Sequence, residues 1–245
     1  MIITETQIWD RFNTNKSTLI SADWLKGVYS LDLSDELRWT IGERLGLLAK
    51  EGWDVIKVLI DVYGNQPELI HAAGLCHQEG ACNFLLQLLR EQAKPNIILV
   101  RALACWGAIL STQELKRILG ENSMQMRLAG LNLLSFKAHL LTVNELLDIV
   151  VDLLDDFREE VVIQVIKILQ RRDEVEIIDC ISQIARNGTD KIVETALIAL
   201  GSIGTIQSVE SLSKLSQQFV SETHRSIAQK QISHQHINSS LDCMI

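Results

Sequence analysis

The sequence predicts an all-α fold, a right-handed α-solenoid of stacked helix pairs. Two observations lead to this prediction. Only two prolines, Pro67 and Pro95, interrupt a chain rich in helix-favouring residues, chiefly Leu, Ile, Ala, Glu and Gln. One helix-pair pattern also recurs along most of the 245 residues. With 47% hydrophobic residues, the chain can bury a sizeable core.

The clearest repeat lies in the segment LIALGSIGTIQSVESLSKL. Its glycines, Gly201 and Gly204, join two helical patterns through a tight turn. The same layout occurs upstream, and the junctions fall at residues 46, 74, 107, 135, 170 and 201. They are roughly 28 to 35 residues apart, the period of helical-repeat proteins. We therefore predict about six helix pairs over residues 35–220.

Apolar residues within the repeats follow the helical spacing of three and four. Two such stripes are expected to be core: Leu146, Leu147, Val150, Val151 and Leu154, and then Val161, Val162, Val165, Ile166 and Leu169. Helix boundaries are expected at Asp35, at residues 187–189 and at Thr142, which forms a capping-box pattern with Glu145.

Acidic residues gather where the next helix is expected to begin, at Asp155, Asp156, Glu159 and Glu160. Acids in a first helical turn are stabilised by the helix dipole. We therefore expect these four side chains to be solvated rather than catalytic.

The two ends of the chain depart from the repeat. Residues 1–34 lack the repeat spacing but carry enough apolar side chains to form a helical cap on the first pair. Residues 221–245 begin as a last helix and then lose their apolar pattern. We expect the final ten residues to be disordered.

Charge and composition narrow the possible partners. The formal net charge of −8 disfavours phosphate backbones and anionic membranes, so we expect neither nucleic acid nor membrane as a partner. The chain has no long apolar run and no signal-peptide pattern at its start, which indicates a cytoplasmic protein. Its cysteines are odd in number and widely spaced, so reduced thiols are expected at Cys76, Cys82, Cys105, Cys180 and Cys243.

Common catalytic signatures do not occur in the sequence. It contains no phosphate-binding loop, no dinucleotide-binding glycine motif, no HExxH zinc motif and no nucleophile elbow. Whether the chain is an enzyme is left open, and a non-enzymatic function is favoured. The densest group of metal ligands is Cys76, His77 and Cys82, which could bind zinc or an iron–sulfur centre. The alternative is that both cysteines are small buried apolar residues.

Three arginines lie early in the first helices of successive pairs: Arg101, Arg127 and Arg158. In a stacked solenoid they could form a ladder that binds carboxylates of a partner. The alternative is ion pairing with acids of neighbouring repeats. We also assign His71 and Trp106 to the partner-binding surface.

Four of the five tryptophans lie in the first 53 residues, at Trp9, Trp24, Trp39 and Trp53. They could pack the terminal cap or form an exposed docking patch, and packing is favoured because large aromatic residues dominate cores.

The segment LGSIG, followed by Val209 and Leu212, resembles the short HEAT-like repeats of cyanobacterial E/F-type phycobilin lyases and their relatives. The segments QPELIHAAGLCHQEGACNFLL and VRALACWG are similar to those of related cyanobacterial HEAT proteins, which act in phycobilisome assembly or turnover or bind iron–sulfur carriers. The resemblance implies a HEAT-repeat fold, and no catalytic motif of the lyases can be assigned to residues here.

The favoured function is a scaffold or adaptor that binds a partner protein through its concave face. The first alternative is a phycobilin lyase or lyase subunit, with Arg101 and Arg127 holding the bilin propionates and a phycobiliprotein or a second HEAT subunit as partner. The second is a partner of an iron–sulfur carrier. No cofactor is expected under the favoured function, and a bilin or a metal would accompany the alternatives.

Overall fold

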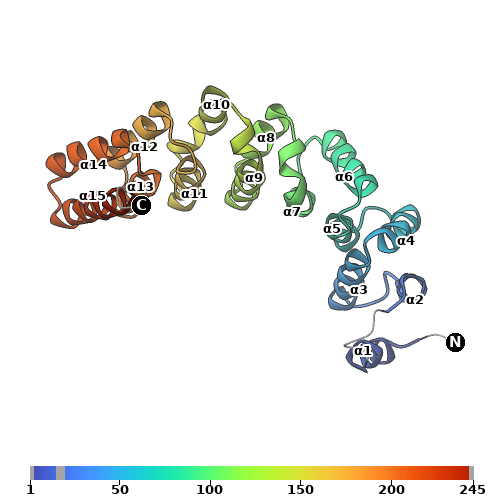
Figure 1. Ribbon diagram of the computed structural model, residues 1–245. Helices are drawn as coiled ribbons and strands as arrows, with labels where there is room; N and C mark the ends of the chain where they lie inside the picture. Colours follow the sequence, from blue (N-terminus) through green and yellow to red (C-terminus); the bar gives the residue numbers. More distant parts are fainter. Residues whose placement is uncertain (1–2, 15–19, 243–245) are drawn as a thin grey trace. The chain divides into compact units, whose positions relative to one another are not determined.

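The structure is a computed structural model that describes residues 3–14 and 20–242, without the side chains of Cys105 and of residues 236–242. Among the residues singled out above, Cys243 and the Cys105 side chain therefore lie outside the described part. In the described ranges, all regular secondary structure is helical, which confirms the all-α prediction (Figure 1). None of these helices combines the length and the hydropathy needed to cross a membrane.

The helices fall into two compact units, Met1–Gly107 and Ala108–Ile245. The first unit contains α1 (Glu5–Thr14), α2 (Ala22–Val28), α3 (Asp35–Leu47), α4 (Ala49–Tyr63), α5 (Pro67–Leu75), α6 (Glu79–Glu91) and α7 (Ile97–Ala102). The 3-10 helix η1 (Ala104–Ile109) lies at the boundary. The second unit contains α8 (Thr112–Leu119), α9 (Met124–Lys137), η2 (Ala138–Leu140), α10 (Val143–Leu154), α11 (Glu159–Leu169), α12 (Val175–Asn187), α13 (Asp190–Ile203), α14 (Ile206–Gln218) and α15 (Glu222–Asp242).

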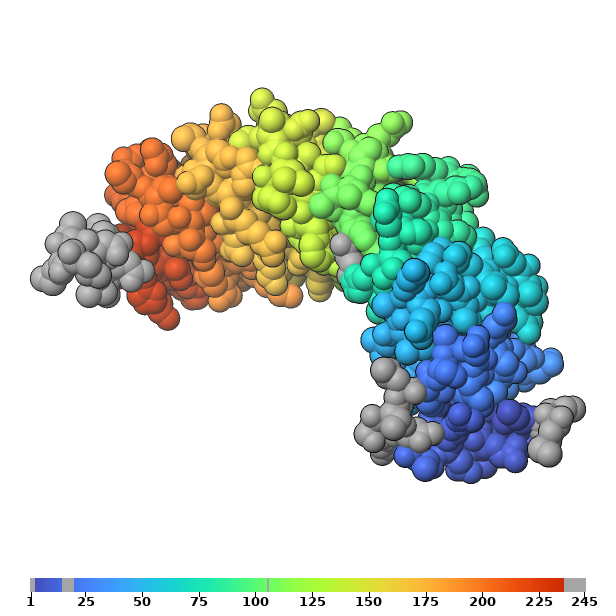
Figure 2. All heavy atoms as spheres, turned by 45° about the vertical axis from the view of Figure 1, so that its right-hand side comes forward, coloured from blue at the N-terminus to red at the C-terminus, as the bar shows by residue number. Residues whose placement is uncertain are grey.

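Each unit is a stack of helix pairs, as the repeat predicted. In the first unit α3 packs on α5, and α5 packs on α7. In the second, α9, α11 and α13 form one layer, while α8, α10, α12 and α14 form the other (Figure 1). Within each unit the colours of the space-filling view follow one another in bands, so pairs adjacent in sequence are adjacent in space (Figure 2).

The predicted junctions fall in or just before the observed turns of six pairs, from α3/α4 to α13/α14. The third pair is divided, because α7 belongs to the first unit and α8 to the second. The capping box of Thr142 and Glu145 begins α10 as predicted. A second one, Ser111 with Glu114, begins α8. Gly204 ends α13 in the left-handed conformation, with φ of 72°, which confirms the glycine turn.

Three of the junction glycines have a different role from the one predicted. Gly46, Gly74 and Gly201 lie inside α3, α5 and α13 rather than in turns. A Cβ atom at Gly46 would lie 2.6 Å from the Cβ of Leu75, and one at Gly74 would lie 2.7 Å from the carbonyl oxygen of Ala102. These glycines therefore allow the first helices of neighbouring pairs to approach closely.

The core largely follows the predicted stripes. The α11 stripe is buried throughout, and so are Leu146 and Val150 of α10. Leu147 and Leu154 are half-buried, and the side chain of Val151 is 52% exposed. The expectation that Val151 belongs to the core is therefore wrong, since this residue lies on the edge of α10 that turns towards a cavity.

The aromatic residues of the first unit pack among themselves. Trp53 is buried, and its ring centroid lies 5.9 Å from that of Phe84. Phe12 packs edge-on against both Trp9 and Trp24, at 5.8 and 5.9 Å. These contacts support packing over an exposed tryptophan patch.

Both ends of the chain form helices where they are described. Ile8, Phe12, Leu25 and Val28 of α1 and α2 are buried, as a cap would require. At the other end α15 packs on α13 and α14 and runs to Asp242. Seven of the final ten residues, 236–242, thus belong to α15, and only residues 243–245 lie outside the described part. The disordered end stays a prediction for those three residues, and so do the limits at residues 34 and 220.

Candidate functional site

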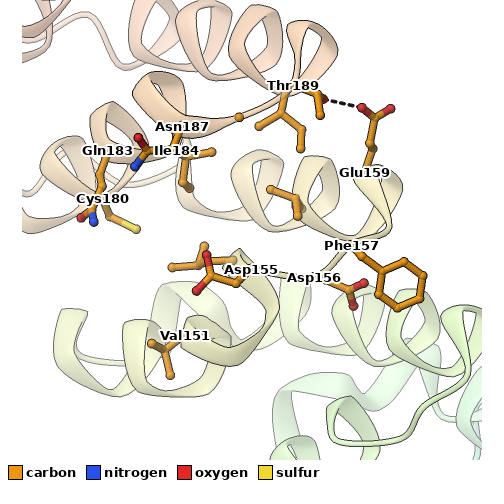
Figure 3. Close-up of a pocket in the computed structure, with 14 residues that line it drawn as sticks. Val151, Asp155, Asp156, Phe157, Glu159, Cys180, Gln183, Ile184, Asn187 and Thr189 are labelled. Atoms are coloured by element: carbon orange, nitrogen blue, oxygen red, sulfur yellow. Dashed lines mark hydrogen bonds between the residues drawn. The ribbon is translucent and has the colours of Figure 1, made fainter.

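A cavity of about 460 Å³ opens in the second unit between the α10–α11 segment and the α12–α13 segment (Figure 3). Val162 and Ile192, both buried, contribute apolar lining. Val151 and Asp155 come from one wall, and Cys180 comes from the opposite wall. We call this site, which is lined by residues between Val151 and Ile192, the α10–α13 cavity.

The loop between α10 and α11 is shaped by Asp156, whose side chain has no exposed surface. Its carboxylate receives two hydrogen bonds from the Arg158 guanidinium, with Nε to Oδ1 at 2.7 Å and Nη2 to Oδ2 at 2.8 Å. The backbone N–H of Arg158 donates a third hydrogen bond at 2.9 Å, and Arg127 donates a fourth. Such bidentate, charge-assisted hydrogen bonds hold a carboxylate in one orientation.

The same two arginines connect the α10–α11 loop to the α8–α9 loop, which joins the preceding two repeats. Arg127 donates from Nε to the carbonyl oxygen of Glu121 at 2.7 Å, and Arg158 donates from Nη1 to that of Asn122 at 2.6 Å. Glu121 and Asn122 lie in the loop between α8 and α9. The arginine pair thus fastens two successive inter-repeat loops together.

Asp156 is ionised at neutral pH. Burial raises the pKa of this carboxyl, but the hydrogen bonds from Arg158 and Arg127 outweigh burial and lower the pKa to about 2. The expectation that Asp156 is solvated is therefore wrong: it is the buried centre of an ion-pair cluster, because two guanidinium groups compensate its desolvation.

Asp156 points into the protein, and the side chain that follows it, Phe157, points to solvent. Phe157 is 88% exposed and lies beside the cavity, where the guanidinium carbon of Arg158 sits 4.7 Å from its ring centroid (Figure 3). This cation–π contact lies on one face of the ring. A large aromatic side chain is thus exposed at the rim of the cavity.

The opposite wall carries two amides, Gln183 and Asn187, on α12. Within the described residues neither side chain makes a hydrogen bond, so both can bond to a ligand. Cys180 also lines this wall, and burial raises the pKa of its thiol. The thiol therefore stays protonated at neutral pH and is a weak nucleophile.

Three acidic residues line the cavity: Asp155, Asp156 and Glu159. Residues 145–160 contain seven acidic side chains and one basic side chain, Arg158. Asp156 is neutralised by its arginines, and Glu159 accepts a hydrogen bond from Thr189 across the cavity (Figure 3). Asp155 is exposed at the rim and makes no ion pair within the described residues. Asp155 therefore places a negative charge without an ion pair at the mouth of the cavity, next to apolar lining residues.

The three arginines predicted to form a ladder do not share one environment. Arg127 and Arg158 belong to the second unit, where both bind Asp156 and are only 17% and 14% exposed. This is the ion-pairing alternative rather than a free cationic surface. Arg101 belongs to the first unit, where its side chain is exposed on α7.

The other residues assigned to a partner surface lie in the first unit, half-buried in ring contacts. The ring centroid of His71 lies 5.3 Å from that of Trp39, and the ring centroid of Trp106 lies 5.7 Å from that of His77. Neither contact includes Arg101.

The three predicted metal ligands are not brought together. Cys76 and Cys82 are buried, and burial raises the pKa of both thiols, that of Cys76 to about 12. His77 is exposed and turned to Trp106. In the described part of the chain, no three or more His, Cys, Asp or Glu side chains are placed to hold a metal ion. The alternative of small buried cysteines fits these positions.

Sequence reasoning missed Phe157 and the amides Gln183 and Asn187. A signal for Phe157 was present, because a lone aromatic residue in DDFREE belongs to no apolar stripe. The amides carry no such signal, since exposed Gln and Asn residues are common on helices.

No protein-family model matches the chain, and no curated protein is significantly similar to it. Human deoxyhypusine hydroxylase, solved in complex with glycerol, aligns over 87% of this chain and 84% of its own, with 15% identity and a TM-score of 0.41. An engineered protein aligns over 88% and 96%, with 14% identity and a TM-score of 0.39. At these low TM-scores neither structure bears on function, and the resemblance to phycobilin lyases remains a prediction of the sequence.

Proposed function

We propose that this chain is a scaffold or adaptor that binds a partner protein at the α10–α13 cavity. One observation carries the proposal: Phe157 and Val151 remain 88% and 52% exposed beside a cavity of about 460 Å³. Large apolar side chains exposed around a cavity are typical of surfaces that bind another molecule. A stack of helix pairs supplies an extended surface of this kind.

The energetics favour docking through a few side chains. Covering one large apolar side chain contributes about 1.5–3 kcal/mol. A partner that covers Phe157 and places a second such side chain in the cavity therefore gains about 3–6 kcal/mol, before the costs of association. A short segment of the partner is enough to make these contacts, as at binding hot spots.

The arginines have a supporting role in this proposal. Arg127 and Arg158 hold Asp156, and through it the loop that presents Phe157. Arg101 remains a proposed contact on the first unit, because its side chain is exposed and makes no ion pair within the described residues. His71 and Trp106 stay secondary candidates there. A cytoplasmic location is part of the proposal.

The two alternative functions gain no support from the described residues. A bilin propionate would need Arg127, whose guanidinium already binds Asp156 and the Glu121 carbonyl. An iron–sulfur function would need Cys76 and Cys82, which are buried.

Affinity capture with matched variants tests the proposal. The full chain, a Val151→Arg variant and a Val175→Arg variant are immobilised and exposed to native lysate, and the bound proteins are identified by mass spectrometry. The side chain of Val175 on α12 is 51% exposed, a fraction similar to that of Val151, but it lies outside the cavity. Thermal melts confirm that both variants fold.

We expect at least one protein to bind the full chain and Val175→Arg but not Val151→Arg, because an arginine at 151 blocks the cavity. A phycobiliprotein subunit or a second helical-repeat protein would be identified directly by this experiment. Equal capture by both variants would show that partners bind elsewhere, and Arg101 would be tested next.

A further inference from the structure

We infer that the α10–α13 cavity recognises a partner segment in which a lysine or arginine lies beside a large apolar side chain. This inference rests on the proposed function and specifies the chemistry of the docked segment. It follows from three properties of the cavity: its apolar lining, the sign of its charge and its unbonded amides.

The apolar lining calls for an apolar side chain of the partner. Val162 and Ile192 are buried in the wall, and Val151 is half-exposed next to them. A volume of about 460 Å³ accommodates one large side chain and part of the chain that carries it. Phe157 at the rim can cover a second apolar group.

The charge around the cavity selects the sign of the neighbouring residue. Asp155 is exposed at the mouth without an ion pair in the described part. Asp152, one turn earlier on α10, is also exposed, but it lines a neighbouring hollow with Lys116 and Arg127 rather than this cavity. Arg127 and Arg158 are both bound to the buried Asp156. On the opposite wall Arg186, next to Asn187, donates a hydrogen bond to Gln218, and Lys191, next to Ile192, is exposed. A basic side chain would therefore be attracted to the mouth and an acidic one repelled.

The amides favour a peptide as the occupant. Gln183 and Asn187 lie four residues apart on α12 and line the same wall. Each offers both a donor and an acceptor, which suits the N–H and C=O groups of a polypeptide backbone. A docked segment can thus hold its main chain on α12, its apolar side chain in the cavity and its cation at Asp155.

Binding of designed peptides to the full chain tests this inference. The probes are fluorescent dodecapeptides with Ser-Gly flanks around a four-residue core, either Arg-Leu-Phe-Lys, Glu-Leu-Phe-Glu or Arg-Ala-Ala-Lys. Each is made also with one glycine between the charged and the apolar residues. Affinity is measured by fluorescence anisotropy for the full chain, Val151→Arg, Asp155→Asn and the control Val175→Arg.

We expect the basic apolar peptides to bind most tightly. Their Kd should rise about tenfold with Val151→Arg, since the variant removes a central anchor point. It should rise about threefold with Asp155→Asn, as expected for a partly exposed ion pair, and stay unchanged with Val175→Arg. Alkylation of Cys180, followed by mass spectrometry, should slow when the peptide is bound, because this thiol lines the cavity.

The outcomes separate this inference from the proposed function. Equal binding of the acidic apolar peptides, still lost with Val151→Arg, would overturn the charge preference and leave the cavity as a docking site. Binding of Arg-Ala-Ala-Lys as tight as that of Arg-Leu-Phe-Lys, unaffected by Val151→Arg, would show attraction by surface charge alone and overturn both. Failure of every basic apolar peptide to bind would overturn the inference.

Discussion

Asp156 determines how the loop between α10 and α11 presents its side chains. Its carboxylate is buried and is held by Arg127 from the preceding repeat and by Arg158 from its own loop. Because these bonds fix Asp156 inward, the adjacent Phe157 is directed to solvent. A single buried carboxylate thus links the stability of the stack to the shape of the cavity rim.

Replacing this carboxylate should destabilise the fold. We expect Asp156→Asn to lower the free energy of unfolding by about 2–3 kcal/mol, since it leaves two partly buried guanidinium groups without a counter-charge. Asp155→Asn changes the neighbouring exposed acid and should stay within about 0.5 kcal/mol of the original chain. Urea denaturation followed by circular dichroism measures both. Equal stability of the two variants would contradict the role assigned to Asp156.

The same carboxylate should make stability depend on pH in the acid range. The pKa of Asp156 is about 2 in the folded chain, below its ordinary value of 3.8. The unfolded chain therefore takes up the proton first as pH falls, and about 2 kcal/mol of stability is lost between about pH 4 and pH 2. Above pH 4 this contribution is fully present.

Urea midpoints at several pH values between 5 and 2.5 provide the measurement. The gap between the original chain and Asp156→Asn should be constant near pH 5 and should narrow steadily below about pH 4, because protonation removes the charge that the variant lacks. A gap that stays constant to the lowest pH would rule out a depressed pKa at Asp156.

At the level of helices, close packing of the first helices depends on glycine. α5 packs between α3 and α7, and Gly74 faces Ala102 with no room for a side chain. We expect Gly74→Ala to destabilise the chain by about 1–3 kcal/mol, because the added methyl group overpacks this contact.

Gly27→Ala is the matched control for this prediction. Gly27 lies in α2, and a Cβ atom there would have no neighbour within 4 Å. This variant should stabilise the chain by about 0.5–1 kcal/mol, since alanine loses less backbone entropy in a helix. Thermal melts of both variants give the comparison, and a neutral or stabilising Gly74→Ala would contradict the close approach of α5 and α7.

The helices themselves could be predicted, because local spacing encodes them. The three-and-four spacing of α10 and α11 and the capping box at Thr142 are complete within one helix. The contacts between helices could not be predicted in the same way. Arg127 and Asp156 are 29 residues apart, and nothing in either neighbourhood identifies the other as its partner.

At the scale of the whole chain, the structure moves the expected binding surface from the three arginines to the α10–α13 cavity. The sequence pointed to Arg101, Arg127 and Arg158, whereas in the second unit Arg127 and Arg158 are bound to Asp156 and a cavity lined by apolar and polar residues remains open. The stretch 145–160, with seven acids and one base, supplies much of the excess negative charge in a chain of net charge −8. Three of these seven acids, Asp155, Asp156 and Glu159, line the cavity.

Photo-crosslinking from position 157 decides whether a partner protein docks at this cavity. p-Benzoylphenylalanine is placed at Phe157, or at the control position Phe136 on α9, which is 46% exposed and lies outside the cavity. After irradiation in native lysate, we predict one discrete crosslinked species from position 157, which disappears when Val151→Arg is added. Position 136 should not give that species. No crosslink from position 157, or one that persists with Val151→Arg, would contradict docking at the α10–α13 cavity.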